Sequence, residues 1–219
     1  MTTHHLSLEH LVRPPVTSAV KAPAVFLFHG YGSNEEDLFS FAPELPGELC
    51  VISARAPHSL PPYGFAWYHI DFDANFGKWS DTAQARESVG KMVHFIEEAI
   101  DAYALDHTRI TLLGFSQGTV LSFALALSYP NMIRNVVGLS GYIDENILVD
   151  GYQDKDHRHL KMYVSHGQFD PVIPVSWATK TPPILERLGI PYTFEEFPTG
   201  HGVSRENFYA MSAWLNQHF

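Results

Sequence analysis

Short apolar runs alternate with longer amphipathic runs along most of this chain, and this alternation constrains the fold more than any other feature. Residues 24–28 form a continuous apolar run, as expected of a strand covered on both faces. Further runs lie at residues 51–53, 110–113, 136–139, 162–164 and 192–194, and residues 6–12 have the pattern of an edge strand. The pattern is typical of βαβ units, so it predicts an α/β fold with a mainly parallel sheet of about seven strands and helices on both faces.

Three intervening segments have helical character. Residues 82–103 carry apolar side chains at spacings of three and four, with Asp81 and Gln84 resembling a capping box at the start. Residues 117–129 are apolar nearly all round and stop before Pro130, which predicts a buried central helix. The last helix is expected to begin near Ser204.

The composition fits one globular domain spanning residues 1–219. The chain has 45% hydrophobic and 17% charged residues, which is close to the average of globular proteins. We find no repeat, low-complexity tract or linker that would divide it. The oligomeric state stays open, with a homodimer as one option.

Charge and hydropathy exclude several classes of partner. The net charge of −10 disfavours nucleic acid and anionic membrane surfaces. No apolar stretch approaches the roughly 18 residues of a membrane span, and the N-terminus lacks a signal-peptide pattern, so we expect no membrane span and a cytoplasmic location. Cys50 lies in an apolar run and is interpreted as a buried small hydrophobe. His4 and His5 could form a metal pair, but a frayed terminus is the preferred interpretation.

One long segment, residues 57–80, is expected to be irregular and is rich in aromatic residues. Long loops in compact domains often act as lids or binding loops, whereas the simpler interpretation is that the rings close over the sheet. We expect only a few of these rings to face a substrate, with Trp67 and Tyr68 as the candidates.

The sequence Gly114-Phe115-Ser116-Gln117-Gly118 directly follows one predicted strand and opens the buried helix. This is the setting that a G-x-S-x-G elbow requires, in which a sharp turn exposes the serine hydroxyl and flanking glycines let neighbouring backbone pass closely. Ser116 is therefore the candidate nucleophile.

A serine nucleophile needs a base and an acid that orients the base, in the chain order Ser, Asp or Glu, His. Asp170 follows the predicted strand 162–164 and is the candidate acid. His201, flanked by glycines after the last predicted strand, is the candidate base. The alternative base is His166. The alternative acids Asp144, Asp154 and Asp156 lie in a polar segment that we interpret as solvated.

The chemistry also needs backbone N–H groups aimed at the developing oxyanion. One is expected from Gln117, the residue after the nucleophile. The second is expected from Tyr31, in the glycine-rich turn His29-Gly30-Tyr31-Gly32 that follows an early strand. His29 is interpreted as bracing this turn by hydrogen bonds.

With these motifs placed, the chain resembles the carboxylesterase/phospholipase family of α/β-hydrolases, which includes the acyl-protein thioesterases. The resemblance covers nearly the whole length. It depends on His29-Gly30-Tyr31-Gly32, the Ser116 elbow, His166-Gly167-Gln168-Phe169-Asp170-Pro171 and Gly200-His201. It implies a single-domain α/β-hydrolase without a large cap, the triad Ser116, Asp170 and His201, and a site that needs no metal and no cofactor.

The predicted function is hydrolysis of a small-molecule carboxylic ester or thioester through an acyl-enzyme on Ser116. Tyr31, Ser33 and Thr119 depart from residues that the family often has, so the acyl preference is left open. The alternatives are a peptidase or amidase on the same fold and a non-catalytic ligand-binding scaffold. A dienelactone-hydrolase-like role is disfavoured because the candidate nucleophile is serine and not cysteine.

Overall fold

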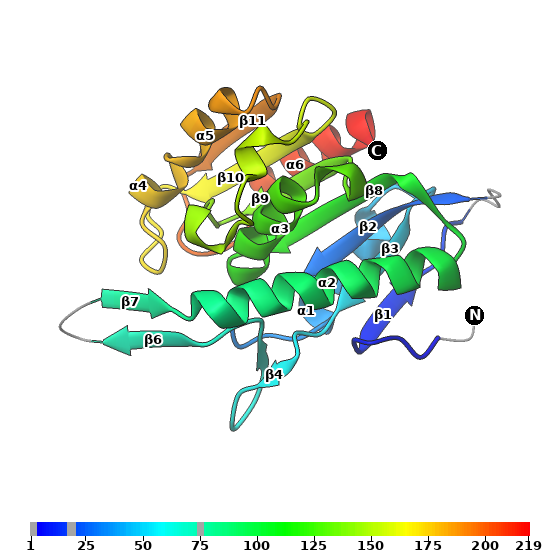
Figure 1. Cartoon of the computed structure of the whole chain (residues 1–219), viewed down its shortest axis with the longest axis horizontal. Coiled ribbons are helices and arrows are strands. Elements are labelled where there is room, and N and C mark those ends of the chain that lie inside the picture. Colours follow the sequence, from blue (N-terminus) through cyan, green and yellow to red (C-terminus); the bar gives the residue numbers. More distant parts are fainter. Residues whose placement is uncertain (1–3, 17–20, 74–76) are drawn as a thin grey trace.

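The computed structural model describes residues 4–16, 21–73 and 77–219, with the backbone alone at 71–73 and 77–79. Its centre is a seven-stranded sheet with the order β1-β3-β2-β8-β9-β10-β11 (Figure 1). The strands are β1 (His10–Arg13), β2 (Ala22–Phe28), β3 (Cys50–Ala54), β8 (Leu105–Phe115), β9 (Asn135–Leu139), β10 (Lys161–Gly167) and β11 (Tyr192–Phe197). Only β1 is antiparallel to its neighbour in this sheet, and the other neighbours pair in parallel.

The sheet confirms the predicted number and type of strands, although β8 begins at Leu105, well before the predicted run 110–113, and the edge strand is shorter than predicted. The edge strand β1 begins at His10 and not at residue 6. It pairs with β3 from His10 opposite Ala54, and β3 ends at Ala54, so the earlier residues have no partner strand. Leu8 is nevertheless buried, which explains its apolar character.

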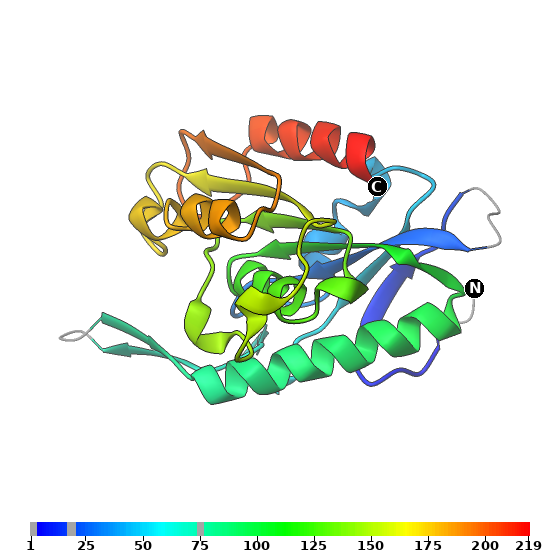
Figure 2. The ribbon, with the colours of Figure 1, turned by 45° about the horizontal axis from the view of Figure 1, so that its top comes forward.

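Helices cover both faces of the sheet, as predicted. The α-helices are α1 (Glu36–Phe39), α2 (Thr82–Ala102), α3 (Gln117–Ser128), α4 (Val175–Ala178), α5 (Thr181–Arg187) and α6 (Arg205–His218). Single 3₁₀ turns lie at Ala42–Glu44, Pro130–Met132, Glu145–Ile147 and Tyr152–Asp154. Figure 2 shows α6 and α2 on opposite sides of the sheet.

Two apolar clusters form the core, one on each face. The larger cluster packs residues of α2, α3 and α5 on side chains such as Phe26 and Leu112. The smaller cluster packs α1 and α6 on the alternate residues, such as Val25 and Leu113. Because successive strand residues point to opposite faces and both faces are covered, β2 is apolar throughout, as is the end of β8 from Leu112 to Phe115.

The helix predictions agree with the structure. In α2 the side chain of Asp81 accepts a hydrogen bond from the backbone N–H of Gln84, which caps the helix. The second bond of a capping box is absent, because Oε1 of Gln84 accepts from the N–H of His69 and the N–H of Asp81 donates to the carbonyl of His69. Every residue of α3 is buried. Ser204 caps α6 by accepting from the N–H of Asn207.

The aromatic segment 57–80 corrects the expectation of an irregular loop. It contains two short antiparallel hairpins, β4 (His58–Ser59) with β5 (Phe65–Ala66), and β6 (Ile70–Asp73) with β7 (Gly77–Ser80). Strands of two to four residues are too short to give a readable period of two. The second hairpin projects from the body of the protein (Figure 1). The side chains of Phe72, Phe76 and Trp79 lie outside those that the structure describes.

No helix in the described ranges is long and apolar enough to span a bilayer. The longest, α2, has one polar and one apolar face.

Candidate active site

Ser116 lies in a sharp turn between β8 and α3. Its φ of 52° is in the left-handed region, which is unfavourable for a residue with a side chain. The turn is held because the Ser116 N–H donates to the carbonyl of Leu139 at 2.9 Å. Gly118 is required next to it, since a Cβ there would lie 1.9 Å from the carbonyl oxygen of Phe28. The strand and the helix thus meet in the strained turn that the sequence predicts.

Ser116, His201 and Asp170 form a continuous hydrogen-bonded chain. The hydroxyl of Ser116 lies 2.9 Å from Nε2 of His201, and Nδ1 of His201 lies 2.7 Å from Oδ2 of Asp170. The Asp170 side chain is fully buried and that of His201 is 17% exposed. A carboxylate bonded to Nδ1 fixes the proton there and leaves Nε2 free to accept the hydroxyl proton, which is the arrangement that activates a serine.

Backbone N–H groups hold the other oxygen of Asp170. Oδ1 accepts from Val172 at 2.8 Å and from Ile173 at 2.9 Å. His166 lies near Oδ2, with its Nε2 3.3 Å from that oxygen and 2.8 Å from the carbonyl of Ile173. Gly167 lets the His201 loop approach, because a Cβ there would lie 2.2 Å from the carbonyl oxygen of Gly200.

The alternatives that the sequence left open for base and acid have other partners. His166 is fully buried and contacts the acid and a carbonyl, as described above. Asp144 caps a 3₁₀ turn, and Asp156 pairs with Arg158 on the surface. Asp154 is exposed. None of these contacts is with the hydroxyl of Ser116.

The glycine-rich turn after β2 lies against the elbow. A Cβ on Gly30 would lie 3.4 Å from Cβ of Ser116, so Tyr31 directly follows a residue whose backbone lies close to the candidate nucleophile. His29 braces this turn as predicted: its ring is hydrogen bonded to the carbonyl of Gly30 at 2.7 Å and accepts the N–H of Ala56 at 3.0 Å. Burial lowers the pKa of His29, which favours the neutral ring that both bonds require.

Gln117 occupies the first position of α3. The first N–H groups of a helix have no partner within it, so this N–H is suited to bind an oxyanion. Its side chain, 2% exposed, turns the other way and is hydrogen bonded to the backbone of Trp67 and Tyr68.

Trp67 and Tyr68 differ from the expectation of substrate-facing rings. The side chain of Trp67 is 0% exposed and packs against Phe28 and His29, so it offers no surface to a ligand. Tyr68 is 3% exposed, and burial raises the pKa of its hydroxyl. Aromatic density in the sequence does not distinguish rings below a site from rings that line it.

Two exposed apolar side chains beside the triad were not singled out from the sequence. Phe169 is 71% exposed and Val172 is 46% exposed, on either side of Asp170. The sequence could have indicated them, because both residues lie within two positions of the candidate acid. They expose apolar surface close to the candidate acid in the sequence.

An ion pair near the same edge was also missed. Arg55 donates through Nε to Glu35 at 2.6 Å and lies 4.8 Å above the ring of Phe65. Glu35 follows the glycine-rich turn, and its side chain is 9% exposed. The Arg55 guanidinium holds the pKa of Glu35 below its usual value. The sequence could have indicated this pair, because Arg55 lies between Ala54 and Ala56 in an apolar stretch and a charge there needs a partner.

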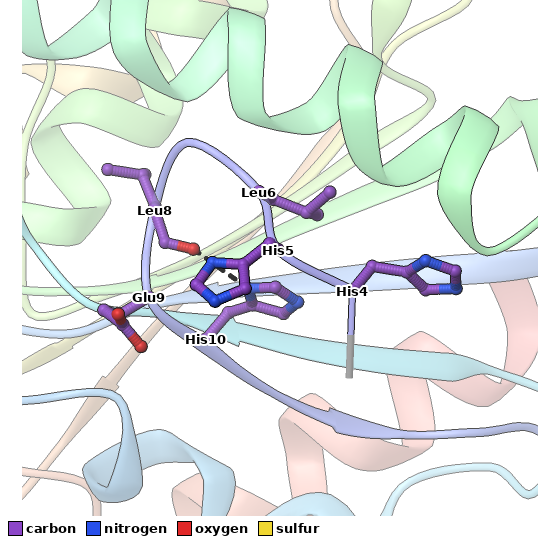
Figure 3. Close-up of a pocket in the computed structure, with 6 residues that line it drawn as sticks. All are labelled: His4, His5, Leu6, Leu8, Glu9 and His10. Atoms are coloured by element: carbon purple, nitrogen blue, oxygen red, sulfur yellow. Dashed lines mark hydrogen bonds between the residues drawn. The ribbon is translucent and has the colours of Figure 1, made fainter. Parts of the chain in front are cut away.

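No group of three metal-ligating side chains occurs in the described part of the chain. Three histidines do line a pocket beside β1, and Figure 3 shows them with the other lining residues. His10 is hydrogen bonded to the carbonyl of Leu8 and to the hydroxyl of Tyr103, and His4 packs on the same tyrosine.

Cys50 is buried, which raises the pKa of its thiol to about 11.

Comparisons with known proteins show the family of this chain. The model of the phospholipase/carboxylesterase family matches residues 16–219. The chain belongs to this family. A relative from Yarrowia lipolytica, acyl-protein thioesterase 1, is 30% identical over 172 residues, which cover 74% of this chain and 75% of the relative. A probable carboxylesterase SOBER1-like of Arabidopsis thaliana is 27% identical, over 84% of this chain and 67% of the relative.

Solved structures show the same fold for this family member. The carboxylesterase of Bacillus cereus superposes with a TM-score of 0.82 at 20% identity, covering 97% of this chain and 95% of that protein. The predicted α/β-hydrolase fold is therefore confirmed, as is the predicted resemblance to carboxylesterases and acyl-protein thioesterases. Membership of the family supports hydrolysis of an ester or thioester by this chain.

Proposed function

We propose that this protein hydrolyses carboxylic esters or thioesters of small molecules through an acyl-enzyme on Ser116. The observation that carries the proposal is the hydrogen-bonded chain from Ser116 through His201 to Asp170, with bonds of 2.9 and 2.7 Å. It occurs in a member of the phospholipase/carboxylesterase family. A serine, a neutral imidazole and a buried carboxylate in this order need no metal to attack a carbonyl carbon.

The reaction has two halves. In the first, the Ser116 oxygen bonds to the carbonyl carbon and its proton passes to Nε2 of His201. The tetrahedral intermediate then breaks the bond to the alcohol or thiol, which leaves with that proton. In the second, water attacks the acyl carbon while His201 takes its proton, and the acid is released as the Ser116 hydroxyl reforms.

Two backbone donors would stabilise the negative oxygen of each intermediate. The N–H of Gln117, at the start of α3, is one, and the N–H of Tyr31 is the other. The support for Tyr31 is that the preceding residue, Gly30, is so close to Ser116 that a Cβ there would contact it. Loss of one such donor costs on the order of 10²–10³ in rate in serine hydrolases.

Exposed apolar side chains near the candidate acid favour apolar substrates. Phe169 and Val172 expose large apolar surfaces beside Asp170, and an acyl or alkyl group that covers them would be desolvated on binding. We propose a preference for short to medium acyl chains. Of the two rings named from the sequence, Tyr68 and Trp67, neither has the exposure to contribute much to this surface.

A series of p-nitrophenyl esters from acetate to palmitate, with a matching thioester and anilide, tests the proposal. We expect ester hydrolysis that peaks at short or medium chains, with the anilide slower. Ser116→Ala should lower kcat by roughly 10³-fold or more. Undiminished turnover by Ser116→Ala would contradict the acyl-enzyme, and faster cleavage of the anilide than of the ester would favour an amidase.

A further inference from the structure

Trp67 makes hydrogen bonds to two segments of the candidate active site. Its backbone N–H donates to Oε1 of Gln117 at 2.8 Å, and its indole N–H donates to the carbonyl of His29 at 3.0 Å. Its own carbonyl accepts from the hydroxyl of Ser88 on α2. The residue is completely buried, so all of its polar groups are used within the protein.

The bond to Gln117 is one of a pair. The same side-chain amide donates through Nε2 to the carbonyl of Tyr68 at 2.7 Å. The side chain of Gln117 thus hydrogen bonds the backbone of two consecutive residues of the aromatic segment, Trp67 and Tyr68. Since the backbone N–H of Gln117 is one proposed oxyanion donor, the segment is fixed to the residue that carries that donor.

The hydrogen bond from the indole to His29 links Trp67 to the segment that carries the other proposed donor, the N–H of Tyr31. The carbonyl of His29 accepts the indole N–H, and its ring is hydrogen bonded to the carbonyl of Gly30. Gly30 immediately precedes Tyr31. The ring of His29 also packs against the indole at 5.6 Å between centroids. The backbone that leads into Tyr31 is therefore hydrogen bonded to the same tryptophan.

We propose that Trp67 is a positioning residue that sets the relative placement of the two oxyanion donors, the N–H groups of Gln117 and Tyr31. This inference rests on the proposed function. Donors stabilise an oxyanion only when both point to the place where the charge develops, so a small change in their relative position lowers the rate. Close contact of Gly118 with the end of β2 brings the two segments together, and the hydrogen bonds of Trp67 give them a defined orientation.

A role in packing alone makes a different prediction. Phe28 contacts the indole edge to face at 5.4 Å, so removing the ring would lower stability in either case. Only a positioning role lowers transition-state stabilisation while substrate binding is retained. The test must therefore separate kcat from KM and keep the ring volume nearly constant.

The variant Trp67→Phe removes the indole N–H and retains most of the ring. Trp214→Phe is the matched control, because Trp214 is also largely buried but belongs to the cluster on the other face of the sheet. With a p-nitrophenyl ester we expect Trp67→Phe to lower kcat about ten-fold with little change in KM, and Trp214→Phe to change neither.

A trifluoromethyl ketone gives a second measurement. Ser116 would add to its carbonyl carbon, with the hydroxyl proton passing to Nε2 of His201, and the carbonyl oxygen would become an oxyanion between the donors. The corresponding alcohol has no carbonyl and cannot form this adduct. Trp67→Phe should weaken the ketone by a factor similar to the loss in kcat and leave binding of the alcohol unchanged. Gln117→Met removes the side-chain hydrogen bonds from Gln117 to Trp67 and Tyr68 and should also lower kcat and ketone affinity. The double variant Trp67→Phe/Gln117→Met should lose little more than either single variant.

The outcomes are distinct. If Trp67→Phe is folded and matches Trp214→Phe in kcat and in ketone affinity, the inference is overturned. If Trp67→Phe does not fold, Gln117→Met decides by the same two measurements. If the wild-type protein hydrolyses no ester and does not bind the ketone, the proposed function itself has failed, and the inference fails with it.

Discussion

The carboxylate of Asp170 has neighbours on both oxygens. Two backbone N–H groups hold Oδ1, and His201 and His166 approach Oδ2 at 2.7 and 3.3 Å. Because Nε2 of His166 also lies 2.8 Å from the carbonyl of Ile173, that nitrogen carries the proton, and its partial positive charge faces Asp170. His166 therefore helps to fix the carboxylate that orients His201.

This contact predicts the behaviour of two substitutions. His166→Phe removes the N–H and should lower kcat roughly ten-fold, because the carboxylate loses a fixed neighbour. His166→Gln retains an N–H group close to the position of Nε2 and should recover most of the activity. Ester kinetics of both variants provide the measurement.

A comparison in a second background separates this role from general destabilisation. In the Asp170→Ala background, His166→Phe should have almost no further effect on the rate of fluorophosphonate labelling. An equal loss with and without the Asp170 carboxylate would contradict the account, as would a Gln variant no better than the Phe variant.

At the scale of elements, the ion pair of Glu35 and Arg55 joins the start of α1 to the end of β3. Arg55→Met should lower the free energy of unfolding by roughly 2 kcal/mol near neutral pH, since it removes hydrogen bonds to a charged group. Arg158→Met is the control, because its pair with Asp156 is exposed and should contribute little.

The sign of the pH dependence follows from the lowered pKa of Glu35 in the folded protein. The stabilisation from this pair is present above the unfolded value of about 4.3 and is lost as the pH falls through the lower folded value. Urea unfolding at pH 6 and pH 3 should therefore show the difference between wild type and Arg55→Met shrinking at the lower pH. A difference of constant size would contradict the assigned partner.

Elements with a long apolar run could be predicted from the sequence, and short ones could not. The buried strands β2 and β9 and the helix α3 are apolar enough to be recognised without tertiary information. The hairpins β4–β5 and β6–β7 have strands of two to four residues and depend on contacts with other segments. One such contact is the hydrogen bond from Gly32 to the carbonyl of Phe65.

The candidate site divides in the same way. Ser116, Asp170 and His201 follow strand ends, and strand ends meet at one edge of a parallel sheet, so their proximity could be predicted. The burial of Trp67 could not, since it depends on hydrogen bonds to His29 and Gln117, which lie far away in the sequence.

At the scale of the whole molecule, the parallel sheet brings three distant chain segments to one edge. The elbow after β8, the loop after β10 and the loop after β11 supply Ser116, Asp170 and His201. Their hydrogen bonds join residues 85 and 31 positions apart in the sequence. The sheet therefore assembles the candidate triad, and each residue is held by its own backbone turn.

Mass spectrometry of the intact protein after reaction with a fluorophosphonate tests the central claim most directly. The account predicts one added phosphonyl group per wild-type chain, located on the peptide that contains Ser116, and no addition to Ser116→Ala. An unmodified wild-type protein, or a modification that persists in Ser116→Ala, would contradict it.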